Sequence, residues 1–335
     1  MGKGGRAKMP NRKRKGESRF AFIMDPLDRV LVDKDTTFVF MLEAQFRGHE
    51  IYFLGLRDLY ARGKQVFARV RQCELTRRGN PHYKFLDDGV EYPIEHFEAV
   101  FMRKDPPADA AYLYATMLLS LADERQTFVL NNPAGLREAN EKLYSLNFPD
   151  AIPPTLVTCE IPRLKAFLEE QEGEMIVKPL DGHGGEGVFL ATSKDRNLGA
   201  ILETVTQFET RLIMAQRYLP EARKGDKRLI VLNGEPLGCT LRVPREDEHR
   251  GNIHVGGNCV KAPITARDRD ICRMLKPRLE RDGLYFVGLD IIGDYLTEVN
   301  VTSPTGVQEI DRLDGANLEG KVIDFVESRV AELKR

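Results

Sequence analysis

A glycine-rich loop is the first feature of this sequence that could do chemistry. Residues 182–187 read GHGGEG, which fits the phosphate-binding spacing G-x-G-x-x-G. The dinucleotide-binding form of this motif needs a strand before the glycines and a helix after them. Here β-branched and aromatic residues follow at 187–191, which predicts a second strand. No Lys-Ser or Lys-Thr pair follows either, so this is not a Walker A loop.

The loop is therefore predicted to be a flap between two antiparallel strands, at 175–177 and 187–191. Glycines let the backbone of such a flap approach phosphate groups closely, and Lys178 supplies a cation on the flap's own first strand. A hairpin tip without a ligand is the alternative. Four glycines in six residues are more than a turn needs, which favours the phosphate-binding interpretation.

Three oxygen-bearing side chains lie close together near the end of the chain. Residues 285–301 predict two strands with a short turn between them, and Glu298 and Asn300 share one face of the second strand. A two-residue turn would pair Asp290 with Thr297 and leave Glu298 on the opposite face. A three-residue loop or a bulge would pair Asp290 with Glu298 and bring all three groups onto one face. We predict this second register.

These three groups suit Mg²⁺, which binds few protein carboxylates and completes its shell with phosphate oxygens and water. A solvated outer face of the sheet is the alternative. Asp290 lies between Leu289 and Ile291 in a strand that is predicted to be buried, where a charge without a role is costly. The pattern therefore favours a metal site.

The first 130 residues predict the elements of an open parallel sheet. Strand, helix and strand follow one another with short links, as in a βαβ unit. Arg103 comes directly after one predicted strand, at the carboxyl end where such sheets bind ligands. The predicted strands are 20–24, 51–54, 99–102 and 128–130, and the predicted helices are 36–47 and 110–123.

The pattern changes after residue 133. A helix is predicted at 134–146, and prolines then interrupt the chain at 149, 153 and 154. Two smaller domains are predicted to follow, one at about 148–216 and one from about 217 to the end. We find no internal repeat in the sequence.

The composition is that of a globular protein. The 335 residues are 42% hydrophobic and 30% charged, with a formal net charge of −1. No run approaches the ~20 apolar residues of a membrane helix, and no apolar segment of a signal peptide follows the early charges. The five cysteines are scattered without a CxxC pair, which indicates reduced thiols and a cytoplasmic location.

The first 19 residues form a basic arm, with eight Lys or Arg residues against one acid. Little in the arm is apolar, so we predict that it is disordered. A basic arm can contact nucleic acid or an anionic surface. A solubilising or start-site extension is the simpler interpretation, and we do not expect the arm to contact nucleic acid.

Several segments together resemble the prokaryotic glutathione synthetase family of ATP-grasp ligases. The resemblance runs in order over about residues 20–331, and MRKDPP and NVTSPT are its most specific pieces. The matching segments are 24–26 (MDP), 102–107 (MRKDPP), 140–143 (NEKL), 178–187 (KPLDGHGGEG), 225–228 (GDKR), 288–294 (GLDIIGD) and 297–305 (TEVNVTSPT).

The resemblance implies an α/β and α+β architecture. An open α/β domain precedes an ATP-grasp fold, in which two subdomains hold ATP between antiparallel sheets. The implied division is a disordered arm at 1–19, an N-terminal α/β domain at 20–140, an ATP-grasp lid subdomain at 141–216, and a C-terminal subdomain at 217–335 with a mobile loop at 244–258.

The resemblance also implies residue roles. The implied ATP-binding residues are Lys142, Lys178, Gly182, His183, Gly184, Gly185, Gln216, Tyr218, Leu219 and Asp226. Arg103, Arg228 and Arg242 would act at the reacting centre. Substrate would contact Asp25, Arg103, Asn300, Thr302 and Ser303. Mg²⁺, or Mn²⁺ in its place, would bind Asp290, Glu298 and Asn300.

The implied reaction joins γ-glutamylcysteine to glycine through an acyl phosphate, with release of ADP and phosphate. No enzyme nucleophile is needed, which agrees with the absence of a Ser/His/Asp or Cys/His pattern. The family also implies a cytoplasmic homotetramer. Two features depart from the family pattern: the basic arm is extra, and Asn258 stands where a basic residue is expected in the loop.

Two other functions are compatible with parts of the sequence. The same ATP-binding residues would serve another carboxylate–amine ligase with a different amino-acid or peptide substrate, which substrate competition would distinguish. A nucleotide-binding regulator or a nucleic-acid-binding protein could use the arm, but it would not need the full set of Lys, Arg and metal-binding residues. Deleting residues 1–19 tests that function.

Overall fold

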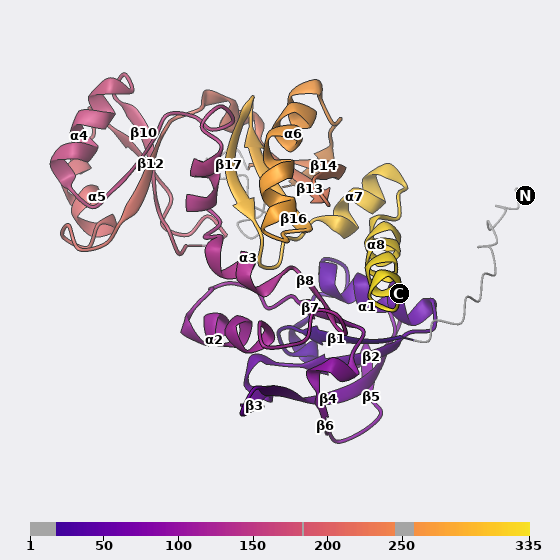
Figure 1. The fold of residues 1–335 in the computed structure, drawn as a ribbon. Helices are drawn as coiled ribbons and strands as arrows, with labels where there is room; N and C mark the ends of the chain where they lie inside the picture. Colours follow the sequence, from indigo (N-terminus) through magenta and orange to yellow (C-terminus); the bar gives the residue numbers. More distant parts are fainter. Residues whose placement is uncertain (1–17, 183, 245–257) are drawn as a thin grey trace, which may run out of the picture.

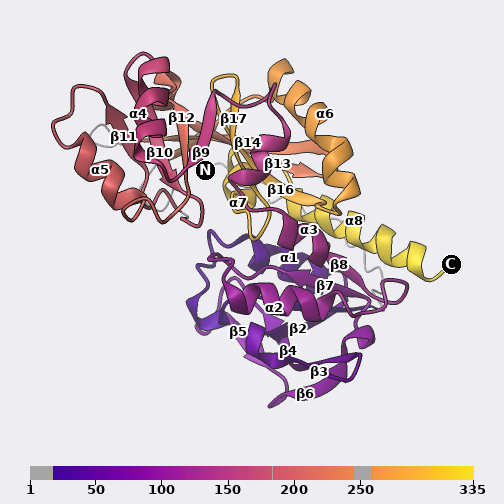
Figure 2. The same cartoon turned by 60° about the vertical axis from the view of Figure 1, so that its left-hand side comes forward.

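The computed structural model describes residues 18–182, 184–244 and 258–335. Three lobes are visible in it (Figures 1 and 2). They are an N-terminal lobe, a small lobe carrying α4 (Ile161–Glu170) and α5 (Leu198–Val205), and a C-terminal lobe carrying α6 (Ala266–Arg281). The arm up to residue 17, His183 and residues 245–257 of the predicted mobile loop lie outside the described residues. The mixed α/β fold class predicted above is confirmed.

The N-terminal lobe is built on the predicted parallel strands. β1 pairs in parallel with β2 and β7, and β7 with β8. Alternate side chains of β1 enter different cores: Phe20 and Phe22 pack with α1 and α8, and Ala21 and Ile23 pack with α2. The elements are β1 (Arg19–Ile23), α1 (Thr36–Phe46), β2 (Glu50–Leu54), β7 (Ala99–Met102), α2 (Ala110–Leu119), β8 (Phe128–Leu130) and α8 (Leu318–Leu333).

An antiparallel extension widens this sheet on the β2 side, and we did not predict it. β4 pairs with β2 through only two residue pairs, Tyr52 with Gln72 and Phe53 with Arg71, and then carries three short strands of its own. β4 alternates buried and more exposed residues over much of its length, but β3, β5 and β6 are only three or four residues long, which is too short to show a period. They are β3 (Leu59–Arg62), β4 (Gln65–Leu75), β5 (Tyr83–Phe85) and β6 (Val90–Pro93).

The predicted continuous helix at 134–146 is wrong. α3 spans Pro133–Glu138, and a 3₁₀ helix at Leu143–Asn147 follows only after a break. Asn140 causes the break, because its side-chain oxygen accepts the backbone N–H groups of Lys142 and Leu143. Its amide also donates to the Leu180 carbonyl of the small lobe. Because the helix is interrupted here, Lys142 lies beside the glycine-rich loop.

The small lobe is a four-stranded antiparallel sheet in the order β11-β10-β12-β9, covered by two helices. The predicted hairpin around the glycines is confirmed, with Val177 paired to Phe189. Leu164, Leu202 and Ile213 pack in its own core. Its elements are β9 (Thr155–Thr158), α4 (Ile161–Glu170), β10 (Glu174–Pro179), β11 (Phe189–Thr192), α5 (Leu198–Val205) and β12 (Ile213–Arg217).

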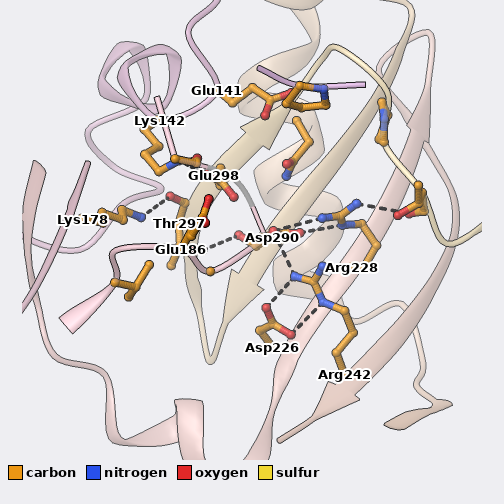
Figure 3. Close-up of a pocket in the computed structure, with 18 of the residues that line it drawn as sticks. Glu141, Lys142, Lys178, Glu186, Asp226, Arg228, Arg242, Asp290, Thr297 and Glu298 are labelled. Carbon is orange, nitrogen blue, oxygen red and sulfur yellow. Dashed lines mark hydrogen bonds and ion pairs between the residues drawn. The ribbon is translucent and has the colours of Figure 1, made fainter. Parts of the chain in front are cut away.

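The C-terminal lobe is a five-stranded antiparallel sheet in the order β15-β14-β13-β16-β17. α6 packs on one face, where Leu275 meets Leu229 and Leu289 in the core. The other face of the sheet carries charged side chains, among them Arg228, Arg242 and Asp290 (Figure 3). The elements are β13 (Asp226–Leu232), β14 (Glu235–Val243), β15 (Asn258–Lys261), α6 (Ala266–Arg281), β16 (Phe286–Ile292), β17 (Tyr295–Asn300) and α7 (Val307–Asp314).

α8 returns to the N-terminal lobe and packs against α1 (Figure 1). Arg47 after α1 donates hydrogen bonds to Asp324 and Glu327 of α8 and to the carbonyl of Gly320. None of the helices in the described ranges is long and apolar enough to span a membrane.

A half-buried carboxyl pair near this helix interface predicts a pH-dependent stability. Burial, and then a hydrogen bond with Asp311, raises the pKa of Glu319 to about 8. An acid whose pKa is raised by folding binds more protons when folded, so stability falls as pH rises between about 4.5 and 8. We expect Glu319→Gln to unfold at higher urea than wild type, with an advantage that grows from pH 5 to pH 8. An advantage that is the same at both pH values would contradict this.

Candidate active site

A cavity of about 670 Å³ lies between the small lobe and the C-terminal lobe. Its walls come from the glycine-rich loop, from β10 and β12, from the charged face of the C-terminal sheet, and from two loops of the N-terminal lobe. A volume of this size suits a ligand as large as a nucleotide or a drug-sized molecule.

Two buried lysines form the cationic end of the cavity (Figure 3). Lys142 Nζ lies 2.9 Å from Glu298 Oε1 and donates to the carbonyl of Gly182. Lys178 Nζ donates to the Thr297 carbonyl at 3.1 Å. Burial lowers the pKa of Lys178 to about 8. Two ammonium groups at one end of a cavity favour a ligand with several negative charges.

The glycine-rich loop closes over these lysines because its backbone adopts conformations that only glycine takes readily. Gly184 and Gly187 have φ values of 63° and 68°. At Gly182 a Cβ atom would lie 2.8 Å from the Pro179 ring and 2.9 Å from the Glu186 carbonyl. The backbone conformation of the loop therefore requires glycine at these positions. The paired strands on either side of the loop agree with its interpretation as a flap.

The predicted register of the C-terminal hairpin is confirmed. Asp290 pairs with Glu298 and Gly288 with Asn300, and a β-bulge between Asp290 and Ile291 takes up the extra residue, Thr297. The hydroxyl of Thr297 donates to the Asp290 carbonyl. The bulge is what brings Asp290, Glu298 and Asn300 onto the cavity side, and all three line the cavity.

Asp290 is the centre of a buried ion-pair network (Figure 3). Arg228 donates to both of its oxygens, at 2.6 and 3.2 Å, and Arg242 Nη2 lies 2.9 Å from Oδ2. Arg242 also donates to Asp226, through Nε at 2.8 Å. Burial alone would raise the pKa of Asp290, but the two guanidinium groups hold it well below its usual range. Asp290 is therefore ionised at every physiological pH.

The oxygen atoms on this hairpin fit a divalent cation. Asp290 and Glu298 supply carboxylates, and Asn300 donates its amide hydrogen to the Gly288 carbonyl, which leaves its oxygen as an acceptor. The described ranges contain no group of three or more His, Cys, Asp or Glu side chains that could hold a metal, and this hairpin supplies only two carboxylates. Two carboxylates and one amide are the incomplete oxygen shell that Mg²⁺ completes with phosphate and water.

Glu141 supports this hairpin from the linker before the small lobe, and we did not predict it. Its Oε1 accepts the backbone N–H groups of Val301 and Thr302 and the Thr302 hydroxyl, at 2.8–3.1 Å. Its backbone carbonyl accepts the N–H of Val299. Burial, and then the charge of Glu298, raises the pKa of Glu141. The Asn140 break in the chain places this carboxylate, and no spacing rule would have indicated it.

An apolar slot lies at the side of the cavity next to β12. Ile176 of the small lobe and Ile292 of the C-terminal lobe line it from opposite sheets, together with Leu219. Gln216 is buried and donates to the Thr155 hydroxyl. A flat apolar ring with hydrogen-bonding edges suits such a slot. Gln216, Tyr218 and Leu219, which the resemblance assigns to ATP binding, all line the cavity.

Of the predicted site residues that the structure describes, two do not line the cavity. Arg103 is buried between Phe40 and Phe286 and donates to the Thr37 hydroxyl and the Pro304 carbonyl. Asp25 pairs with Lys104 at 3.0 Å instead. Arg103 therefore supports the loop at 302–305 from behind, because its guanidinium is occupied by that loop. The described residues that do line the cavity as predicted are Lys142, Lys178, Gly182, Gly184, Gly185, Gln216, Tyr218, Leu219, Asp226, Arg228, Arg242, Asp290, Glu298, Asn300, Thr302 and Ser303.

Several cavity residues were not predicted from the sequence. Most of them reach the cavity only because the lobes pack together in a particular way. Hydrophobic periodicity in the sequence does not predict how lobes pack. These cavity residues include Arg29, Lys34 and Asp35 of the N-terminal lobe, Thr297 on β17, Thr305 in the loop before α7, and Glu309 on α7.

Family models match almost all of the described chain. The model of the prokaryotic glutathione synthetase N-terminal domain matches residues 19–137, and the model of the same family's ATP-grasp domain matches residues 141–315. A glutathione synthetase of Gloeobacter violaceus is 48% identical over 313 residues, covering 92% of this chain and 96% of that protein. One of Escherichia coli is 42% identical over 315 residues, covering 94% and 99%.

Solved structures of lower sequence identity share the fold. D-cycloserine synthetase DcsG superimposes with a TM-score of 0.65 at 16% identity, covering 93% of this chain and all of that one. The ATP-grasp ligase PsnB reaches a TM-score of 0.60 at 14% identity, covering 95% and 100%. At these identities the likeness shows the ATP-grasp fold alone.

Proposed function

The chain belongs to the prokaryotic glutathione synthetase family, and on that premise we propose how its cavity joins γ-glutamylcysteine to glycine. The protein is an ATP-dependent, ADP-forming carbon–nitrogen ligase of glutathione synthesis. A ligase for a different carboxylate and amine is not favoured, since relatives at 41–48% identity carry the name glutathione synthetase. The observation that carries the proposal is that one cavity is lined by two buried lysines, an oxygen set for a divalent cation and two buried arginines.

ATP occupies the side of the cavity between the two sheets in this proposal. The adenine ring lies in the slot between Ile176 and Ile292, and the phosphates extend to Lys142 and Lys178 under the glycine-rich loop. Asp290, Glu298 and Asn300 would hold Mg²⁺ or Mn²⁺. The bound cation supplies neutralisation of phosphate charge. Asp226 contributes indirectly, because it orients Arg242.

The dipeptide carboxylate lies against the two arginines. A carboxylate oxygen attacks the γ-phosphorus of ATP, and the bond between that phosphorus and the ADP oxygen breaks. Glycine binds as an ammonium ion, and its nitrogen first loses one proton to water. The free amine then attacks the acyl carbon, the carbon–oxygen bond to phosphate breaks, and the nitrogen passes its second proton to the departing phosphate. Arg228 and Arg242 stabilise the negative charge that develops at each step, because planar guanidinium groups match carboxylate and phosphate geometry.

The remaining assignments are proposals of the same kind. We place Thr302 and Ser303 against the dipeptide and assign residues 141–216 to a lid subdomain. The loop at 244–258 would close over the acyl phosphate and exclude water. A homotetramer in the cytoplasm is the assembly and location that family membership favours.

Omission of single substrates tests the proposal. The protein with ATP and Mg²⁺ should release phosphate only when γ-glutamylcysteine and glycine are both present, and the product should have the mass of glutathione. Phosphate release that ignores both substrates would remove glutathione synthesis and leave an ATP-grasp ligase of another specificity.

ATP affinity should depend on pH through Lys178. Because burial lowers the pKa of Lys178 to about 8, its phosphate-binding ammonium form is lost as pH rises through that value. Between pH 7 and pH 9 the protonated fraction of Lys178 falls by about tenfold, so we expect ATP binding without metal to weaken by up to about the same factor. Lys178→Arg should bind equally at both pH values, because arginine stays charged. Wild-type affinity that does not change with pH would contradict this role.

A further inference from the structure

Glu309 is a buried acid in the cavity that the mechanism above does not use. It lies in the first turn of α7, and its residue is only 8% exposed. Its Oε2 atom is buried and has no hydrogen-bond partner in the described part of the chain. Its Oε1 atom has one distant partner, Arg312 at 3.5 Å, whose side chain is 53% exposed. A buried carboxylate oxygen without a donor is costly, so a ligand cation would relieve that cost.

Each of the other described carboxylates of the cavity is engaged or exposed. Asp226 and Asp290 are paired with arginines, and Glu298 is paired with Lys142. Asp35 accepts the backbone N–H of Phe38, and Glu141 accepts three hydrogen bonds. Asp105 and Glu186 are exposed to solvent. Glu309 alone among these described cavity acids combines burial with a carboxylate oxygen that has no donor.

The position of Glu309 follows from the order of strands in the C-terminal sheet. Glu298 is on β17, Asp290 on β16, Arg228 on β13 and Arg242 on β14, and these strands are neighbours in that order. α7 packs against β14 and the edge strand β15. Going across the sheet from β17 to β14, the acids proposed to bind metal come first and the two arginines follow. Glu309 on α7 lies beyond the arginines.

A thiol on the edge strand supports this placement. Cys259 on β15 pairs with Arg242 in the sheet register. Burial, and then the negative charge of Glu309, raises the pKa of the Cys259 thiol. Glu309 therefore lies near the Arg242 side of the sheet, away from the lysines that would hold the phosphates.

We propose that Glu309 receives the ammonium group of glycine, the incoming amine, beside the two arginines. The inference rests on the proposed function, in which the arginines hold the carboxyl group that glycine attacks. The attacking nitrogen must approach that carboxyl group from a side free of phosphate, and the Glu309 side of the arginines meets this condition. An ammonium group brings three donors to a carboxylate that has an oxygen to spare.

The test is a comparison of Michaelis constants. Glu309→Gln keeps the shape of the side chain but removes its charge. We expect its KM for glycine to rise by about 10–100-fold, the factor that a charged hydrogen bond contributes. Its KM values for ATP and γ-glutamylcysteine should stay within about threefold of wild type. Glu309→Asp, which keeps the charge, should show a smaller rise in the glycine KM.

Glu319→Gln is the matched control. Glu319 also has a buried Oε2 atom without a partner, but it does not line the cavity. This control should leave all three KM values unchanged.

Three results would overturn the inference. The first is a glycine KM in Glu309→Gln that matches the control, and the second is a KM rise for γ-glutamylcysteine in place of glycine. The second result would assign the site to the dipeptide's own ammonium group. The third is a loss of thermal stability and of kcat with an unchanged glycine KM, which would indicate a purely structural role for Glu309. If the wild-type protein makes glutathione in these assays, only the inference fails; if it does not use glycine at all, the proposed function fails as well.

Discussion

Replacing Asp290 with asparagine is expected to lower kcat by about 10²–10³-fold, the effect of removing one preorganised electrostatic group from an active site. The carboxylate holds Arg228 and Arg242 together and is one of the oxygen ligands proposed for the divalent cation. Its loss leaves two buried guanidinium groups without their shared partner. Breaking a buried pair in this way also costs about 3–5 kcal/mol of stability. Turnover with substrates at saturation, and unfolding by urea, measure the two effects separately.

Asp268→Asn is the control for that stability loss. Asp268 is equally buried and pairs with Lys227 at 2.6 Å, but it caps α6 on the opposite face of the sheet. We expect this variant to lose stability and to keep kcat within about threefold of wild type in its folded form. If Asp290→Asn lost no more turnover than Asp268→Asn, the network around Asp290 would have a structural role only.

The second large effect is expected at Arg228. Arg228→Ala should lower kcat by about 10²–10³-fold while the KM for ATP stays within about threefold. In the proposed mechanism, Lys142 and Lys178 would hold the phosphates at one end of the cavity, and Arg228 would act where the acyl group forms. All three residues line the cavity. Arg228→Lys should recover little, because lysine cannot donate to both Asp290 oxygens and to the Thr305 carbonyl in one plane.

Arg273→Ala serves as the comparison for Arg228→Ala. Arg273 is exposed on α6, and its partner is Asp270, one turn earlier on the same helix. The variant should match wild type in kcat and in every KM, since surface pairs of this kind contribute little. Near-normal turnover of Arg228→Ala would remove Arg228 from the chemistry.

Much of the site could be predicted where local rules decide the structure. The register of Asp290 against Glu298 followed from requiring a buried acid and two neighbouring oxygens on one face, and the bulge at Thr297 meets that requirement. The flap around Gly182 followed from strand-forming residues on both sides of the glycines. Both depend on contacts within about 15 residues of sequence, where periodicity and turn length are informative.

Contacts between lobes could not be predicted in the same way. Glu141 reaches the end of β17 only because Asn140 breaks a helix that the apolar pattern favoured. Arg103 was expected to touch substrate because it follows a parallel strand directly. It is instead enclosed by Phe40 and Phe286, since the loop at 302–305 from the other lobe takes its hydrogen bonds. Sequence separations of 160 and 201 residues link these partners, and no local pattern encodes them.

The central claim is that this cavity transfers the γ-phosphate of ATP to a carboxylate oxygen before the amine attacks. Labelling both oxygens of the reacting carboxylate of γ-glutamylcysteine with ¹⁸O tests it most directly. An acyl phosphate passes one labelled oxygen to phosphate when its carbon–oxygen bond breaks, and the new amide keeps the other. We expect each released phosphate to carry one ¹⁸O atom and the glutathione formed to carry one in its new amide. Unlabelled phosphate accompanying glutathione formation would contradict the account.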